Sequence, residues 1–137
     1  MTYGACGKIV NHRDIPVSER GKTFRIRNND KSRIIIVQVD GCMMKQKEAC
    51  DYLFDVVKNN TVYYVELKGK NVEKAVKQLL STMRYFKSIH KDKSKEFHIV
   101  ASRVPGTTAQ NQKLLREFRS ETGFKLIIKS SSQTISV

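Results

Sequence analysis

The fold is decided by residues 50–69, whose sequence is CDYLFDVVKNNTVYYVELKG. Two runs in this stretch, 50–57 and 61–68, are rich in β-branched and aromatic residues and flank the polar segment 58–60. Side chains of these types pack well on a half-buried pleated surface, and the polar segment has turn chemistry. The stretch therefore predicts two strands joined as a hairpin.

The sequence on either side of this hairpin predicts more strands and then an alternation of helices with strands. Apolar residues recur at intervals of three and four from Val72 to Phe86, which is typical of an amphipathic helix, and Asn71 is expected as its N-cap. A second helix is expected to begin at Thr107 or Thr108 and to end at Gly123. The other strands are expected at 23–27, 33–39, 97–102 and 124–128, with a serine-rich tail that extends the last strand or frays.

The resulting order, β-β-β-β-α-β-α-β, predicts an α/β fold with a mixed sheet flanked by helices. Strands joined through helices are expected to pair in parallel, and the earlier strands to pair antiparallel. A chain of 137 residues, 39% hydrophobic and 28% charged, matches a single globular domain over 1–137. No apolar run approaches the roughly 20 residues of a membrane helix and no signal pattern opens the sequence, so we expect a cytoplasmic protein with no membrane partner.

The composition is strongly basic, with 26 Lys and Arg against 13 Asp and Glu and a formal net charge of +13. A field of this sign favours a polyanionic partner, of which nucleic acid is the commonest. The alternative is a charged surface that only keeps the protein soluble. If the partner is a nucleic acid, phosphate contacts are expected from cations in the second half of the chain: Arg84, Lys87, Lys91, Arg103, Arg116 and Arg119.

The three cysteines, Cys6, Cys42 and Cys50, are an odd number and show no CxxC spacing. Without a signal peptide, reduced thiols are expected. A zinc site built from these cysteines and His12 is the alternative, although their spacings do not indicate it.

One group of charged residues in the hairpin is a candidate metal-binding and catalytic site. Because side chains alternate along a strand, Glu66 and Lys68 share one face of the second strand, while Leu67 points to the other. Pairing around the turn brings Asp51 within reach of Glu66. Two clustered carboxylates repel each other unless a cation neutralises them, and hard oxygen ligands suit Mg²⁺ or Mn²⁺. The alternative is a solvated ion pair of little energetic weight.

These residues resemble the PD-(D/E)XK nuclease superfamily, which has the restriction-endonuclease-like fold. The resemblance covers roughly residues 40–105 and rests on the segments CDYL at 50–53, YYVELKG at 63–69 and AVKQL at 75–79. It implies that Asp51 and Glu66 bind a divalent metal, Mg²⁺ or Mn²⁺, together with the backbone carbonyl of Leu67. It also implies that Lys68 assists the attacking water.

Three further residues are expected to support this site. Gln78 is similar to a glutamine on the helix that follows the core in RecB-like members, although Thr82 stands where those members have an aromatic residue. Glu19 is the early candidate for an additional acidic position. Asp55 shares a strand face with Asp51 by alternation.

The expected function is metal-dependent hydrolysis of phosphodiester bonds in DNA by an endonuclease. DNA is favoured over RNA as the substrate. The resemblance also implies a homodimer, since small stand-alone members of this fold often dimerise because one domain offers little surface to duplex DNA. The alternative is a catalytically inactive protein of the same fold that binds nucleic acid or a protein partner. The sequence does not choose the substrate structure or the pathway.

Overall fold

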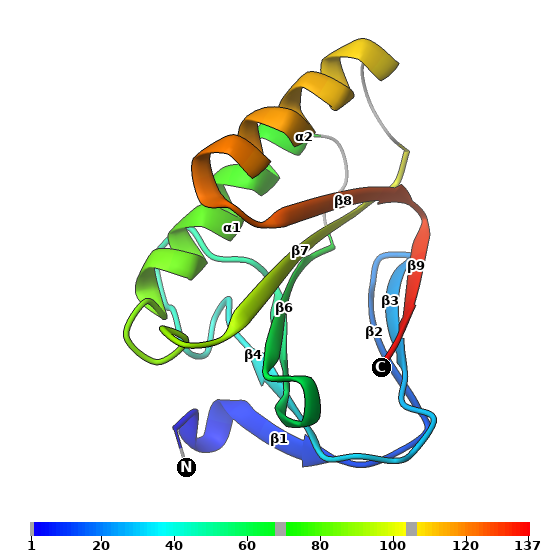
Figure 1. Cartoon of the computed structure of the whole chain (residues 1–137), viewed down its shortest axis with the longest axis vertical. Helices are drawn as coiled ribbons and strands as arrows, with labels where there is room; N and C mark the ends of the chain where they lie inside the picture. The colour runs from blue at the N-terminus through cyan, green and yellow to red at the C-terminus, as the bar shows by residue number, and fades with distance from the viewer. Residues whose placement is uncertain (1, 68–70, 104–106) are drawn as a thin grey trace.

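The structure is a computed structural model and describes residues 2–67, 71–103 and 107–137. Within these residues the elements form three layers: two α-helices, a six-stranded mixed sheet and a three-stranded sheet. Figure 1 shows α1 and α2 on one face of the large sheet, with β2, β3 and β9 beyond its other face. The α/β class and the mixed sheet expected from the sequence are confirmed.

The six-stranded sheet has the order β1-β4-β5-β6-β7-β8. Its strands are β1 (Gly7–Val10), β4 (Ile34–Gln38), β5 (Tyr52–Val56), β6 (Thr61–Glu66), β7 (Ser94–Ala101) and β8 (Lys125–Ser130). The strands from β1 to β6 pair antiparallel, and β6, β7 and β8 pair in parallel. This change of direction follows from the connections, because a tight turn reverses the chain whereas a helical crossover returns it to the same end of the sheet.

The two helices are those predicted, and their ends are capped by the expected residues. Helix α1 (Val72–Tyr85) begins at Asn71, whose side chain accepts a hydrogen bond from the Lys74 backbone N–H. Helix α2 (Thr108–Thr122) begins with a capping box between Thr107 and Gln110. It ends at Gly123, whose φ of 77° is a left-handed conformation that glycine adopts without strain. No helix in the described part of the chain is long and apolar enough to cross a membrane.

The three-stranded sheet contains strands that the sequence analysis missed. It has the order β2-β3-β9, with β2 (Asp14–Glu19), β3 (Lys22–Arg27) and β9 (Ser132–Ser136). Only the strand at β3 was predicted, and the tail does not extend β8 but forms β9, parallel to β3. The β2–β3 hairpin turns through Arg20 and Gly21, both at positive φ, as a type I′ turn requires.

Apolar side chains cover both faces of the large sheet. On β6, Val62 and Tyr64 pack on the helical side, whereas Tyr63 and Val65 pack toward the small sheet. A central strand covered on both sides is apolar throughout rather than alternating.

The N-terminal segment is tied to the sheet by a disulfide. A 3₁₀ turn, η1 (Gly4–Cys6), leads into β1, and Cys6 is bonded to Cys42 across 36 residues of sequence. The expectation that all thiols are reduced was wrong for this pair, and Cys50 stays free and buried. The pairing of β1 with β4 brings the two cysteines together, a long-range contact that cysteine spacing does not reveal. A second 3₁₀ turn, η2 (Val57–Asn59), lies where the hairpin turn was predicted.

Candidate active site

Asp51 and Glu66 lie side by side where β5 begins and β6 ends. Tyr52 pairs with Val65, so the next step along the hairpin sets Asp51 opposite Glu66. The Asp51 backbone N–H donates to Glu66 Oε1 at 3.1 Å, and the Leu67 backbone N–H donates to Asp51 Oδ2 at 2.8 Å. Each carboxylate thus holds the backbone of the opposite strand end. The hairpin predicted this proximity.

Both carboxylates are removed from solvent, with Asp51 6% exposed and Glu66 0% exposed. Their charge acts on the neighbouring Cys50, whose thiol pKa is raised first by burial and further by Glu66 and Asp51. Buried carboxylates that ionise close together need a compensating positive charge, because the low-dielectric interior strengthens their repulsion. The site is therefore suited to a cation.

Glu19 lies at the end of β2 and contributes to the same field. The pKa of Tyr52 is raised by burial first, and then by the negative charges of Glu19 and Asp51. Tyr52 is thus influenced by carboxylates from the small sheet and from the large one. Glu19 is exposed and lies on a strand rather than on an N-terminal helix.

Helix α1 contacts the segment immediately before Asp51 through Thr82. The Thr82 hydroxyl accepts a hydrogen bond from the Cys50 backbone N–H at 2.9 Å and donates to the Gln78 carbonyl at 2.8 Å. Thr82 and Gln78 are both buried. Gln78 therefore lies on the face of α1 that packs toward the site, and its supporting role stays a prediction. Thr82 was not selected as a site residue; the signal was its place four residues after Gln78, on the same helix face.

Asp55 does not join Asp51, although alternation places both side chains on the same face of the hairpin. Asp55 pairs with Val62, four residues farther along the hairpin and roughly 13 Å from the carboxylate pair. Its carboxylate accepts hydrogen bonds from Lys93 Nζ at 2.9 and 2.8 Å and from the Tyr3 hydroxyl at 2.8 Å. The expectation that Asp55 supports the site was wrong, because alternation specifies the face of a strand but not the distance along it.

The Asp55 carboxylate belongs to a separate buried network centred on His90. The Tyr3 hydroxyl lies 2.7 Å from His90 Nε2, and the Tyr64 hydroxyl lies 2.6 Å from Nδ1. Since Tyr3 donates its proton to Asp55, Nε2 must carry the imidazole proton, and Nδ1 accepts from Tyr64. One neutral tautomer satisfies every contact. Burial lowers the pKa of His90 to about 4, which keeps the ring neutral.

The cations expected to contact phosphate are distributed over both ends of the molecule. Helix α1 begins beside the end of β6 and runs back to the start of β7, so Arg84, Lys87 and Lys91 lie at the end of the sheet remote from Glu66. All three are exposed, but a phosphate bound at the carboxylates is out of their reach, about 20 Å along β6.

The three other expected cations are placed differently. Arg103 follows the end of β7, at the same end of the sheet as Glu66. Arg116 and Arg119 lie on α2, where with Lys125 they line a cleft of about 620 Å³ over the edge strand β8. This cleft has apolar walls at Leu115 and Leu126, so cations and apolar surface are combined there.

The chemistry of the donor set fits a hard divalent cation. Asp51, Glu66 and the Leu67 carbonyl offer oxygen ligands, and Mg²⁺ is commonly bound through only one or two carboxylates with the remaining positions filled by water. Among residues 2–67, 71–103 and 107–137, no group of three or more His, Cys, Asp and Glu side chains could hold a metal ion. The zinc site considered for the cysteines and His12 therefore has no support. Lys68 lies outside the described residues.

Comparison with known proteins adds no relative. No family model, no curated protein and no solved structure matches the chain.

Proposed function

We propose that the chain is a metal-dependent nuclease of the PD-(D/E)XK type that hydrolyses DNA. The observation that carries the proposal is the buried pair of Asp51 and Glu66 at the ends of two paired strands. The hairpin, the following helix α1 and the parallel strand β7 support the proposal of a restriction-endonuclease-like fold. The proposal includes that fold.

In this proposal Asp51, Glu66 and the Leu67 carbonyl hold Mg²⁺ or Mn²⁺. The bound cation supplies Lewis-acid stabilisation of the charge that develops on the phosphodiester. Lys68 orients the attacking water and offsets negative charge in the transition state. Thr82 and Gln78 keep the segment that carries Asp51 in place, and Glu19 adds negative charge from the small sheet.

The proposal also names the partner and the assembly. The net charge of +13 favours a polyanion, and DNA is proposed over RNA as the substrate. A homodimer and a cytoplasmic location are part of the same proposal. The Cys6–Cys42 disulfide weighs against the location, because disulfides are rare in reducing compartments.

A second candidate is a nucleic-acid-binding protein of this fold without catalysis. One observation favours it: the carboxylates of Asp51 and Glu66 each accept a hydrogen bond from a buried backbone N–H. Such contacts give both side chains a structural role that does not need a metal. The two candidates make different predictions for variants that keep these hydrogen bonds but remove the charge.

The deciding experiment uses Asp51→Asn, Glu66→Gln and Lys68→Ala beside the wild type. The amide variants keep an oxygen acceptor for the backbone N–H and lose only the negative charge. We expect the wild type to cut supercoiled and linear DNA with Mg²⁺ or Mn²⁺ but not with EDTA. Each variant should cut at least about 100-fold more slowly, since even outer-shell changes at metal sites cost 10–100-fold. Gel assays on plasmid, oligonucleotide, four-way-junction and RNA substrates measure the cleavage rates of the wild type and of each variant.

The exposed Glu48→Gln, a change of the same charge three residues before Asp51, is the matched control and should leave cleavage unchanged. Wild-type protein that binds DNA without cutting any substrate would support the binding protein instead. Cleavage that persists in Glu66→Gln would remove the proposed site even if the protein is a nuclease.

A further inference from the structure

The three-stranded sheet presents a polar, cationic face to solvent. On its central strand β3, Phe24 and Ile26 are fully buried toward the large sheet, so Arg25 and Arg27 point outward. The strands on either side add hydroxyl groups at outward positions. On β2, Ser18 lies opposite Thr23, and on β9, Thr134 lies opposite Arg25.

One end of this face is hollowed into a cleft of about 380 Å³. It is lined by Arg13, Asp14, Arg25, Arg27 and Asn29. The lining holds three guanidinium groups against one carboxylate. Arg25 Nε lies 2.8 Å from Asp14 Oδ1, so the two side chains form an ion pair. The Nε–H of Arg25 does not make a hydrogen bond within this pair. The cleft therefore keeps an excess of positive charge, and the ion pair with Asp14 holds Arg25 in place.

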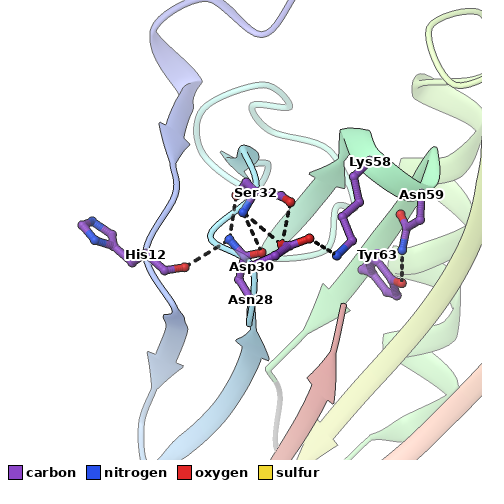
Figure 2. A network of polar contacts seen from close by, with 7 residues as sticks. All are labelled: His12, Asn28, Asp30, Ser32, Lys58, Asn59 and Tyr63. Carbon is purple, nitrogen blue, oxygen red and sulfur yellow. Dashed lines mark hydrogen bonds and ion pairs between the residues drawn. The ribbon is translucent and has the colours of Figure 1, made fainter.

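A buried asparagine fixes the rim of the cleft. The Asn28 side chain donates hydrogen bonds to the His12 carbonyl at 3.1 Å and to the Ser32 carbonyl at 2.6 Å. Its backbone N–H donates to the Arg13 carbonyl at 2.7 Å. Figure 2 shows Asn28 between His12 and Ser32, next to the Asp30–Lys58 ion pair. Two residues of the cleft, Arg13 and Asn29, thus lie in segments that the hydrogen bonds of Asn28 hold together.

We propose that this cleft and the outward face of β2, β3 and β9 bind the phosphodiester backbone of duplex DNA. Arginine forks and Ser, Thr and Asn side chains are the usual protein contacts to phosphate oxygens. The outward positions of these three described strands carry no aromatic side chain, and binding of single strands relies on stacked aromatics. The face therefore matches a continuous backbone whose bases stay paired.

The cleft also lies at a distance from the carboxylate pair that one DNA duplex can span. This argument rests on the proposed function. Strand β2 runs from Asp14 at the cleft to Glu19, whose charge acts on Tyr52 beside Asp51. Five strand residues span roughly 17 Å. Since each strand of duplex DNA carries a phosphate every 3.4 Å or so along the axis, about five nucleotides separate the two places.

Fluorescence anisotropy with a labelled 20-base-pair duplex in EDTA tests this surface without cleavage. The variant is Arg13→Gln/Arg25→Gln/Arg27→Gln. The control removes three equal charges from exposed lysines of the helical layer, Lys74→Gln/Lys77→Gln/Lys113→Gln. We expect the arginine variant to lower the slope of log K against log salt by about 2 to 3, because each phosphate contact contributes roughly 0.9. The control should lower it by less than about one.

A single variant guards against misfolding. Arg27 is exposed, so Arg27→Gln should keep the urea midpoint of the wild type while lowering the slope by about one. Equal slopes for the two triple variants would overturn the proposed surface. Tighter binding of single-stranded DNA or of duplex RNA than of duplex DNA would overturn the proposed ligand.

The nuclease proposal and the surface proposal fail separately. Weakened binding by the arginine variant, in a protein that never cuts DNA, would remove the nuclease and keep the surface. If the protein cuts DNA in a metal-dependent way and the arginine variant binds DNA as tightly as the wild type, the nuclease proposal stands and the surface proposal is wrong. The cleft on α2 lined by Arg116 and Arg119 would then be the next place to examine.

Discussion

Thr82 shows how a single hydroxyl group can connect a helix to a site on a neighbouring sheet. Its Oγ1 accepts the Cys50 backbone N–H and donates to the Gln78 carbonyl, within a fully buried environment. Cys50 immediately precedes Asp51, so the hydrogen bond from Cys50 to Thr82 ties the backbone next to the Asp51 carboxylate to α1. We therefore regard Thr82 as a positioning residue.

Replacing Thr82 by valine keeps the shape and leaves the Cys50 N–H without this partner. We expect Thr82→Val to lower the free energy of unfolding by about 1–3 kcal/mol, the cost of an unsatisfied buried donor. Under the proposed function it lowers kcat with KM nearly unchanged, because Asp51 shifts and the DNA surface does not. Urea denaturation and steady-state cleavage measure the two effects.

Thr82→Ser restores the hydroxyl and should recover most of kcat. The neighbouring Ser81→Ala is the control for a general disturbance of the helix. A kcat that falls equally in Thr82→Ser and Thr82→Val would contradict the positioning role, because only the valine variant lacks the hydrogen bond.

At the same scale, the sequence could predict Asp51 and Glu66 as neighbours but misplaced Asp55. A hairpin with a known turn specifies which residues oppose each other, so the carboxylate pair follows from local pattern. The environment of Asp55 depends on Tyr3 and Lys93, which lie 52 and 38 residues away. Residue spacing carries no information about such partners.

At the scale of elements, β1 depends on a covalent link. It pairs with β4 over four residues, and the Cys6–Cys42 disulfide joins the preceding turn to the segment that follows β4. A short edge strand makes few contacts of its own, so the link limits its detachment. The two cysteines are 36 residues apart in the sequence, so the disulfide closes a long loop and lowers the conformational entropy of the unfolded chain.

Reduction of this disulfide should destabilise the protein measurably. We expect Cys6→Ser/Cys42→Ser, or the wild type with dithiothreitol, to lose about 3–4 kcal/mol of unfolding free energy, from the chain entropy regained on unfolding. Urea denaturation followed by circular dichroism measures the loss. Dithiothreitol should not shift the midpoint of the double serine variant, which serves as the control. An identical midpoint for oxidised and reduced wild type would show that the bond contributes nothing.

The elements missed by the sequence analysis share a physical property. Strands β1, β2 and β9 carry no long apolar run and lie toward the ends of the chain. Their stability comes from pairing with β4 and β3 rather than from their own residue types. The helices and the central hairpin, by contrast, carry strong periodicity and recognisable caps, and these were predicted.

At the scale of the whole molecule, the His90 network joins parts of the chain that are distant in sequence. It links Tyr3 in the N-terminal segment, Asp55 on β5 and Tyr64 on β6 to His90, which follows α1. Lys93 and Lys95 also face this group, the former through Asp55 and the latter through the His90 carbonyl. Loss of this network should therefore affect global stability rather than one loop.

Stability should fall as the pH is lowered from about 6.5 to about 4. Burial, the largest cause, lowers the pKa of His90 to about 4, while Asp55 opposes the shift and the two lysines add to it. Between that value and the unfolded pKa of about 6.5, the unfolded state binds more protons, so unfolding becomes easier as the pH falls. The loss attributable to His90 is about 3 kcal/mol at pH 4.

Urea denaturation at pH 7, 5.5 and 4 measures this dependence. His90→Gln cannot take up the proton and should show a flatter profile over the same range, although its stability at pH 7 is lower. His12→Gln removes an exposed histidine and is the control. A profile for His90→Gln as steep as that of the wild type would assign the pH dependence to other groups.

The sequence by itself determined the central hairpin, both helices with their caps, and the meeting of Asp51 with Glu66. These features depend on periodicity, turn chemistry and capping, which act over a few residues. Only the tertiary structure decided that both faces of the sheet are covered, that β9 joins β3, and that the arginines of β3 gather at a cleft. It also placed Asp55 and Lys91 at the end of the sheet away from the carboxylate pair, because strand lengths and crossovers, not spacing, set the end at which a side chain lies.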